Sequence, residues 1–319
     1  MPTEMLPWCR CCARGFARAE PSPLPIPSPE RRLFLRATTA AVLAGGAGAA
    51  LAREGVEVGP PSMASKLVPA EQIERAAGGQ YQQMLGQARA KRALAPETHP
   101  QMRRLREIAS RLIPHTDAWN PRARAWNWEV NLIGSPQINA FCMPGGKIAF
   151  YYGILEKLQL SDDEVAMIMG HEMTHALREH AREQMGKTMA TRGAIELGAA
   201  IFGLGTGGRI VADMGGQLLT LRFGRDDEKE ADLIGLELAA RAGYDPRSGV
   251  TLWQKMSRAS QRQSIDFLST HPSGESRISG IQAAIPEVEG LYARAEKPPR
   301  RFGPPAAQAA TGVAPTPRR

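Results

Sequence analysis

The sequence has few cysteines, and their positions exclude a disulfide-stapled scaffold. Three of the four, Cys9, Cys11 and Cys12, lie ahead of a predicted cleavage site at residue 52, so cleavage leaves Cys142 alone. A single thiol cannot form an intramolecular disulfide, and the N-terminal cluster lacks the paired spacing of a zinc site. Stability must therefore come from a hydrophobic core, for which 319 residues with 43% apolar content suffice.

A long hydrophobic run is also missing. The apolar run at residues 37–51 has 15 residues, fewer than the ~20 that a membrane-spanning helix needs. It follows Arg31 and Arg32, and Ala50-Leu51-Ala52 supplies an A-x-A cleavage site. The stretch RRLFLR resembles the bacterial twin-arginine (Tat) signal consensus. We therefore expect residues 1–52 to direct export to the periplasm, with the segment either cleaved or kept as an anchor, and peripheral membrane association remains open.

Net positive charge is small once this segment is set aside. The whole chain carries +8, but residues 1–52 hold six Arg and three Glu, which leaves 34 basic and 29 acidic residues, or +5. Much of that excess lies in the C-terminal residues 297–319. The folded part is close to neutral and has no basic footprint for nucleic acid. The sequence predicts no nucleic-acid partner.

The remaining chain predicts one α+β domain at residues 69–296, mostly helical with a small β-sheet or hairpin. A Gly-, Pro- and Ser-rich linker at 53–68 precedes it, and a basic, Pro-rich tail at 297–319 is expected to be disordered. No internal repeat is visible. Period-two alternation and a Met-Pro-Gly-Gly turn predict three strands between residues 125 and 152, the last two forming a hairpin. Helices are expected at 70–94, 101–112, 162–184, 226–242, 246–261 and 275–284, with a loosely joined helical pair at 193–219.

The helix expected at 162–184 has a clear start and a reactive sequence. Ser161 and Glu164 form a capping box, and an H-E-x-x-H element, His171-Glu172-Met173-Thr174-His175, follows about three turns later. Histidines four residues apart project from one face of a helix, so both imidazoles can bind one zinc ion. Glu172 is then placed to act as the general base that activates a hydrolytic water.

A hydrolytic zinc site needs a third protein ligand and one open position. His180 is nearby, but on a continuing helix it is rotated by about 140 degrees from His175 and faces away from the metal. We therefore expect it to be a surface or supporting histidine. A carboxylate from another helix remains as the third ligand.

The order of several motifs resembles the gluzincin family that contains CAAX prenyl proteases, HtpX-like heat-shock peptidases and mitochondrial Oma-type peptidases. The resemblance covers residues 137–286 and includes INAFCMPGGKIAFYYGIL, SDDEVAMIMGHEMTHALREH, RDDEKEADLIG and FLSTHPSGESRI. It implies a zincin-like metallopeptidase domain with one Zn2+ per chain. Helices long enough to span a membrane are missing after residue 52, so the chain looks like the soluble periplasmic BepA/LoiP-like branch.

Ligand roles follow from the resemblance. It implies that Glu228, the first residue of E-x-x-x-D, is the third zinc ligand. It also implies that Asp232 does not bind the metal itself but orients a ligating histidine. Glu230 is the rival ligand; it lies 200 degrees round the helix from Glu228, so both cannot face the metal.

Three further groups are candidates at the same site. The oxyanion that forms during hydrolysis needs a donor, for which His271 is the first choice and Arg277 the second. In exported relatives the matching histidine controls access to zinc, so His271 is alternatively a fourth ligand of a latent state, or an ordinary loop histidine. The segment Asn139, Ala140 and Phe141 resembles the family's substrate-facing edge strand, to which an extended peptide can add. An ordinary core hairpin is the alternative.

The function predicted from these residues is zinc-dependent endoproteolysis of unfolded or misassembled envelope proteins, as part of protein quality control. One alternative is a zinc-stabilised chaperone or assembly factor that does not cleave. Retention of Glu172 argues against it, because zinc binding alone requires no base there. A second alternative is a protease anchored in the membrane by residues 193–219. The natural substrate and the oligomeric state are not predicted.

Overall fold

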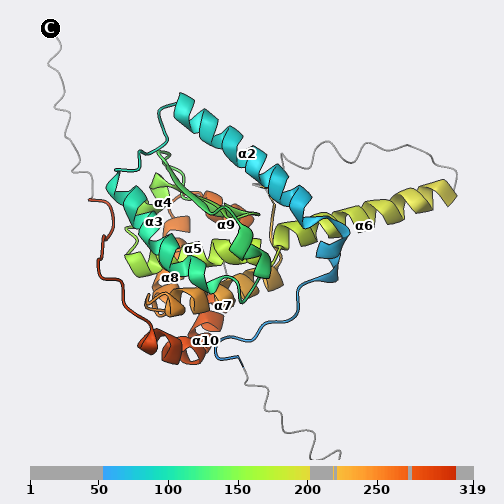
Figure 1. Cartoon of the computed structure of the whole chain (residues 1–319). Coiled ribbons are helices and arrows are strands. Elements are labelled where there is room, and N and C mark those ends of the chain that lie inside the picture. Colours follow the sequence, from blue (N-terminus) through green and yellow to red (C-terminus); the bar gives the residue numbers. More distant parts are fainter. Residues whose placement is uncertain (1–52, 202–217, 219–220, 272–274, 307–319) are drawn as a thin grey trace, which may run out of the picture. The chain divides into compact units, whose positions relative to one another are not determined.

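The computed structural model describes residues 53–201, 218, 221–271 and 275–306. The predicted signal and most of the predicted helical pair at 193–219 lie outside them. In chain order the elements are η1 (Met63–Leu67), α2 (Ala70–Ala90), α3 (Pro100–Leu112), η2 (Ile113–His115), η3 (Pro121–Ala125), β1 (Glu129–Ile133), β2 (Ala140–Met143), β3 (Lys147–Tyr151), α4 (Tyr152–Lys157), α5 (Asp162–Leu177), α6 (His180–Ile201), α7 (Arg225–Arg241), α8 (Ser248–Ser260), α9 (Asp266–Thr270) and α10 (Glu275–Arg294). The predicted α+β class is confirmed (Figure 1).

The sheet has the order β1-β3-β2, with β1 parallel to β3 and β2 antiparallel to β3. The predicted hairpin is therefore present, and β2 is the edge strand at which the sheet ends. Alternation along β2 gives the sheet two apolar faces. Phe141 and Met143 pack with Tyr81 and Leu85 of α2, whereas Ala140 and Cys142 face the larger core that includes α5. This arrangement places β2 directly against the helix that carries the H-E-x-x-H element.

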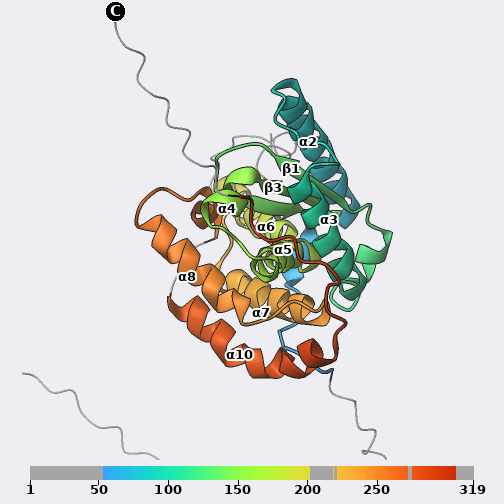
Figure 2. The same cartoon turned by 90° about the vertical axis from the view of Figure 1, so that its left-hand side faces the viewer.

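Helix α5 lies between the sheet and α7, as the end-on view in Figure 2 shows. Its predicted capping box is present: the Ser161 hydroxyl accepts from the Glu164 amide, and the Glu164 carboxylate accepts from the Ser161 amide. Arg104, wholly buried on α3, donates to Asp162 at 2.6 Å. The first turn of α5 is thus fixed by a cap and a buried ion pair, which sets the direction in which the later histidines point.

Helices α5 and α7 approach closely because glycines meet at their crossing. A Cβ added at Gly170 would lie 2.9 Å from the Gly235 carbonyl oxygen, and one added at Gly235 would lie 2.7 Å from the His171 amide nitrogen. Real Cβ atoms are not found at such distances, so the crossing requires two residues without side chains. The close approach brings the acidic face of α7 next to His171.

The helix boundaries differ most from the prediction at the ends of α5 and α10. The helix expected at 162–184 ends at Leu177, Arg178 is its C-cap, and Glu179 has a left-handed backbone with φ of 58° before α6 begins at His180. A glutamate carries no sequence signal for this conformation, which costs a non-glycine residue roughly 1 kcal/mol. The last helix is also longer than expected, since α10 continues through Pro286 to Arg294.

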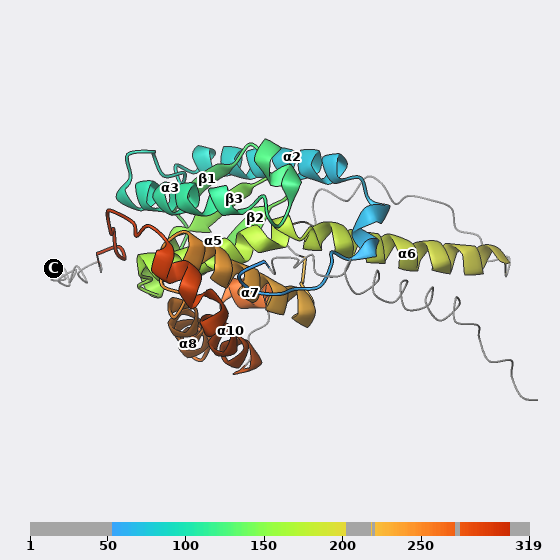
Figure 3. The same cartoon turned by 60° about the horizontal axis from the view of Figure 1, so that its bottom comes forward.

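The segments that flank the domain are attached to it over the described residues. Within the predicted linker, the Val56 amide donates to the buried carboxylate of Glu237 on α7, and η1 packs against α6. From the predicted disordered tail, the Phe302 and Gly303 amides both donate to Asp162. The amino-acid composition of the two segments does not predict these contacts, because each contact depends on a single carboxylate of the domain. Figure 3 shows the N-terminal segment in blue and the C-terminal segment in dark red beside the helices of the domain. None of the helices in these described ranges is both long and apolar enough to cross a membrane.

Candidate metal centre

His171 and His175 lie one helical turn apart on α5 and point to the same spot. Their Nε2 atoms are 3.2 Å apart, and both side chains are almost completely buried. The pKa of His175 lies well below its ordinary value because burial penalises the charged ring and the neighbouring His171, His271 and His180 add to this. A neutral imidazole is the form that binds a metal, so this environment favours the ligand state.

Glu228, near the start of α7, supplies carboxylate oxygens to the same spot. One oxygen lies 3.6 Å from His171 Nε2 and the other lies 3.6 Å from His175 Nε2. Ligands on a tetrahedral zinc with bonds of about 2.1 Å are about 3.4 Å from one another. The spacings fit a single zinc ion held between two imidazoles and one carboxylate, and the two nitrogens and one oxygen are ligand types that zinc accepts.

His271, which follows α9, brings a fourth donor to the cluster. Its Nδ1 lies 3.3 Å from His171 Nε2 and 2.9 Å from Glu228 Oε1, and the four ligand atoms all lie within 4.8 Å of one another. Phe267 stacks on its ring with centroids 4.5 Å apart. Burial alone would lower the pKa of His271, but the carboxylates of Glu172 and Glu228 outweigh burial and raise it. His271 is thus a fourth possible ligand for a metal ion bound at this cluster.

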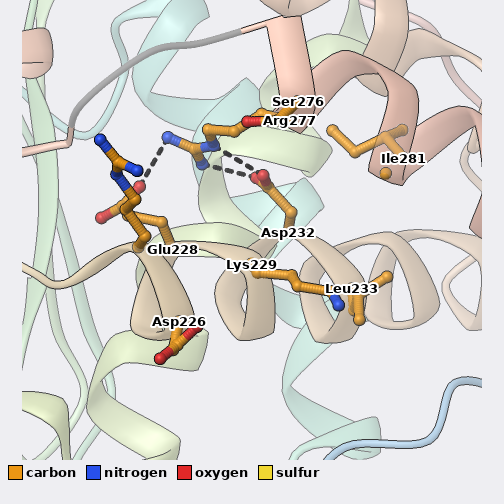
Figure 4. A pocket seen from close by; sticks show the side chains of 10 residues that line it. Asp226, Glu228, Lys229, Asp232, Leu233, Ser276, Arg277 and Ile281 are labelled. Carbon is orange, nitrogen blue, oxygen red and sulfur yellow. Dashed lines mark hydrogen bonds and ion pairs between the residues drawn. The ribbon is translucent and has the colours of Figure 1, made fainter.

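Asp232 and Arg277 contact two of the candidate ligands, His171 and Glu228. Asp232 Oδ1 is 3.1 Å from His171 Nδ1, the contact that the sequence predicts for a residue orienting a ligand. Arg277, on α10, donates twice to Asp232 at 2.7 and 2.6 Å and lies 2.6 Å from Glu228 (Figure 4). Burial alone would raise the pKa of Asp232, but Arg277 and His171 together outweigh burial and lower it. The structure thus places Arg277 against the carboxylates that support the cluster.

Glu172 is buried beside the cluster, on the same helix as the two histidines. Its Oε1 is 3.6 Å from His271 Nε2 and has no hydrogen-bond partner among the described residues. Burial raises the pKa of the Glu172 carboxyl above its ordinary value, although His271 and His171 act in the opposite direction. A buried carboxylate oxygen without a hydrogen bond is costly, and a raised pKa suits a general base. Both features are typical of a group kept for reactivity.

A small cleft connects the cluster with the edge strand. Asn139, Ala140 and Phe141 line it together with Glu172, His175 and His271, and its volume is about 80 Å³. The residues Leu218, Leu221 and Phe223, which precede α7, line the same cleft. Phe223 stacks on His175 with ring centroids 3.9 Å apart. The sequence analysis did not single out Phe223, because its role depends on the loop before α7 and has no motif.

His180 lies elsewhere than the sequence predicts. It is buried, and its Nδ1 is 2.9 Å from His175 Nδ1, because the chain turns at Glu179 and the helix does not continue. The expected continuation of the helix through His180 is therefore wrong, whereas a histidine that supports a ligand is what the structure shows. Its Nε2 is 2.8 Å from a carboxylate oxygen of Glu230, the rival ligand, which is directed at His180. Burial alone would raise the pKa of Glu230, but hydrogen bonds from His180 and Arg178 outweigh burial and lower it.

Two histidines one turn apart on a helix, joined by a carboxylate from a second helix, define a zincin-like metallopeptidase domain. The sequence profile of peptidase family M48 matches residues 99–285, and the chain belongs to this family. The predicted resemblance is therefore confirmed.

Individual relatives agree with this assignment. The chain is 38% identical over 177 residues to the mitochondrial metalloendopeptidase OMA1 of Arabidopsis thaliana, covering 56% of this chain and 36% of the relative. It is 26% identical over 197 residues to the metalloprotease LoiP of Escherichia coli, covering 60% and 74%. It is 28% identical over 158 residues to the beta-barrel assembly-enhancing protease of Yersinia pestis, covering 46% and 32%. The alignments thus span from about a third to about three quarters of these relatives, and less than two thirds of the OMA1 protein.

Proposed function

We propose that this chain is a zinc-dependent metalloendopeptidase that hydrolyses unfolded or misassembled proteins of the bacterial envelope. Membership of a peptidase family supports the activity, and the names of several relatives contain the word metalloendopeptidase or protease. The observation that carries the proposal is the position of Glu172. It lies buried beside the metal-binding cluster, with a raised pKa and an oxygen that no described residue satisfies.

The ligands in this proposal are His171, His175 and Glu228. A zinc ion held there supplies Lewis-acid chemistry, which makes water acidic near neutral pH and polarises a peptide carbonyl. Glu172 accepts a proton from the attacking water and passes it to the leaving amine. Asp232 keeps His171 in the tautomer whose Nε2 is free to bind, and Arg277 holds Asp232 and Glu228 in place. Arg277 then acts as a positioning residue, because its donors are directed at these carboxylates.

Substrate binding in this proposal uses the edge strand. Since β2 ends the sheet, an extended peptide can add to it through main-chain hydrogen bonds at Asn139, Ala140 and Phe141. The cleft of about 80 Å³ next to this strand is lined by Leu221 and Phe223 as well as by Glu172. His271 has two alternative roles in this proposal: a donor to the oxyanion, or a fourth ligand of a latent state.

Export is the second part of the proposal. The twin-arginine stretch at residues 31–36 supports a periplasmic location, and one bacterial relative is named a beta-barrel assembly-enhancing protease. Replacing Arg31 and Arg32 by lysine is expected to leave the protein in the cytoplasm, as cell fractionation would show. An unchanged periplasmic fraction would count against this route.

A noncatalytic zinc-stabilised chaperone is the second candidate. One observation favours it: with His271 the cluster has four donors, as in closed structural zinc sites. Glu172 opposes it, since a structural site gains nothing from a buried carboxylate oxygen that accepts no hydrogen bond from a described residue.

Cleavage of an unfolded protein by the purified full chain separates the two candidates. Wild type is expected to contain one zinc per chain and to cleave, and a chelator should abolish cleavage. Glu172→Gln should retain zinc and lose cleavage by at least ~100-fold, as for removal of a general base. Equal cleavage by the two forms would refute the role of Glu172. His271→Ala in the same assay distinguishes a latent fourth ligand, whose removal raises cleavage, from an oxyanion donor, whose removal lowers it.

A further inference from the structure

His175 has two ring nitrogens, and the structure gives each a different neighbour. Its Nε2 faces the metal-binding cluster, 3.2 Å from His171 Nε2. Its Nδ1 lies 2.9 Å from Nδ1 of His180, a side chain with 1% of its surface exposed. Direct contact between two imidazoles is unusual beside a ligand, since the common outer partner of a ligating histidine is a carboxylate, a carbonyl or water.

Hydrogen bonding allows one assignment of protons along this contact. Two Nδ1 atoms at 2.9 Å share one hydrogen, so one ring donates and the other accepts. A ligand imidazole binds the metal through its unprotonated nitrogen, so His175, bound through Nε2, carries its hydrogen on Nδ1 and donates. His180 therefore accepts at Nδ1, and the hydrogen of its neutral ring is on Nε2.

The far side of His180 fits this assignment. Its Nε2 lies 2.8 Å from Glu230 Oε2, and a carboxylate oxygen is an acceptor. The other oxygen of Glu230 is 2.7 Å from Arg178 Nη2, which also donates to the Gly59 carbonyl at 2.6 Å. The two hydrogen bonds, from His175 to His180 and from His180 to Glu230, thus each have one donor and one acceptor. Arg178 links Glu230 at the end of this chain of bonds to Gly59 in the N-terminal segment.

The turn between α5 and α6 makes this contact geometrically possible. On a continuous helix His180 would be rotated by about 140 degrees from His175. Because Glu179 adopts a left-handed backbone, the chain changes direction and returns the His180 ring to within 5.0 Å of the His175 ring, measured between centroids. A conformation that costs energy is thus retained at the position that aligns the two rings.

We propose that His180 is a positioning residue for the metal, which fixes the tautomer and ring orientation of His175 and is itself fixed by Glu230 and Arg178. The proposal rests on the proposed function in one respect, that His175 is a zinc ligand. The two histidine ligands are then supported differently: Asp232 contacts His171 directly, whereas Glu230 acts on His175 through an intervening imidazole.

The zinc affinity of the full chain tests the positioning role of His180 independently of cleavage. It is measured by competition with a chromophoric chelator. His180→Phe keeps a ring but removes the acceptor, and it is expected to weaken zinc binding by about 10- to 100-fold, the usual effect of losing an outer hydrogen-bond partner. His180→Asn places an amide oxygen near the position of Nδ1, and it should retain an affinity close to wild type. His115→Phe is the matched control, because His115 lies outside the cluster.

Rescue by asparagine is the result that separates positioning from packing. Equal weakening in both variants, or no weakening in His180→Phe, would overturn the proposal. Should wild type bind zinc tightly and fail to cleave, the proposed function would fail while the affinities still decide the role of His180.

Ring-nitrogen NMR shifts of the zinc-loaded wild type provide a second test that needs no substitution. The expected spectrum shows His175 protonated at Nδ1 and His180 protonated at Nε2. A His180 ring protonated at Nδ1 would contradict the assignment even if the variants did not fold.

Discussion

Replacing Arg277 by methionine removes the group that balances two buried carboxylates. The guanidinium makes contacts of 2.6 to 2.7 Å with Asp232 and Glu228 and lies 3.6 Å above the Trp253 ring. Removing one partner of a buried ion pair costs about 3–5 kcal/mol, because the other charge is left without compensation. Methionine can still pack on Trp253, so most of the loss in unfolding free energy should come from removal of the positive charge. We expect the zinc-free protein to lose about 3–5 kcal/mol of unfolding free energy.

Zinc should reduce this loss, because the ion itself balances Glu228. Thermal unfolding with chelator and with zinc measures both states. At roughly 2–4 °C per kcal/mol for a domain of this size, the zinc-free midpoint should fall by about 6–20 °C, and the zinc-loaded midpoint by less. Arg106→Met is the control, since its pair with Glu97 is exposed and its loss should leave the midpoint nearly unchanged. A loss below ~1 kcal/mol for the zinc-free Arg277 variant, or a larger loss with zinc than without, would refute the reasoning.

Two further predictions concern the helix crossing and the pH dependence of stability. Gly235→Ala should force α7 away from α5, which should cost about 1–3 kcal/mol of unfolding free energy and weaken zinc binding. Gly78→Ala is the control: this glycine faces open space on α2, and the change should stabilise the protein by about 0.5–1 kcal/mol. Urea unfolding measures stability and chelator competition measures zinc affinity; equal effects of the two variants would contradict the tight contact between α5 and α7. Burial, with Arg241, lowers the pKa of His115, so its contribution to stability is present above its unfolded pKa of about 6.5 and is lost as the pH falls through the lowered folded pKa. His115→Gln should therefore lose less stability than wild type on acidification below about pH 6.5, and identical urea-unfolding profiles would show that His115 does not contribute.

The parts of the site that local sequence determines could be predicted. The capping box at Ser161 and the four-residue spacing of the histidines fix α5 and the face on which His171 and His175 lie. The Met-Pro-Gly-Gly turn likewise determines the hairpin, in which Gly145 and Gly146 both have positive φ. The third donor depends on contacts between distant helices, and only the family resemblance indicated Glu228.

Other features depend on tertiary contacts that leave no local pattern. Nothing in the sequence marks Glu179 for a left-handed backbone, so helical extrapolation gave His180 the wrong direction. Residues 301–303 look like tail by composition, yet the amides of Phe302 and Gly303 donate to the Asp162 carboxylate, which is buried at the start of α5. Arg277 was predicted as the second choice, after His271, for the donor to the oxyanion. Its double contact with Asp232 becomes evident only when α10 is placed against α7.

The position of the metal tests the central claim most directly. Crystals of the zinc-loaded full chain, measured at the zinc absorption edge, should show one anomalous peak about 2.0–2.2 Å from Nε2 of His171, Nε2 of His175 and a carboxylate oxygen of Glu228. A peak that lacks either imidazole, or that is ligated by a carboxylate other than Glu228, would contradict the account.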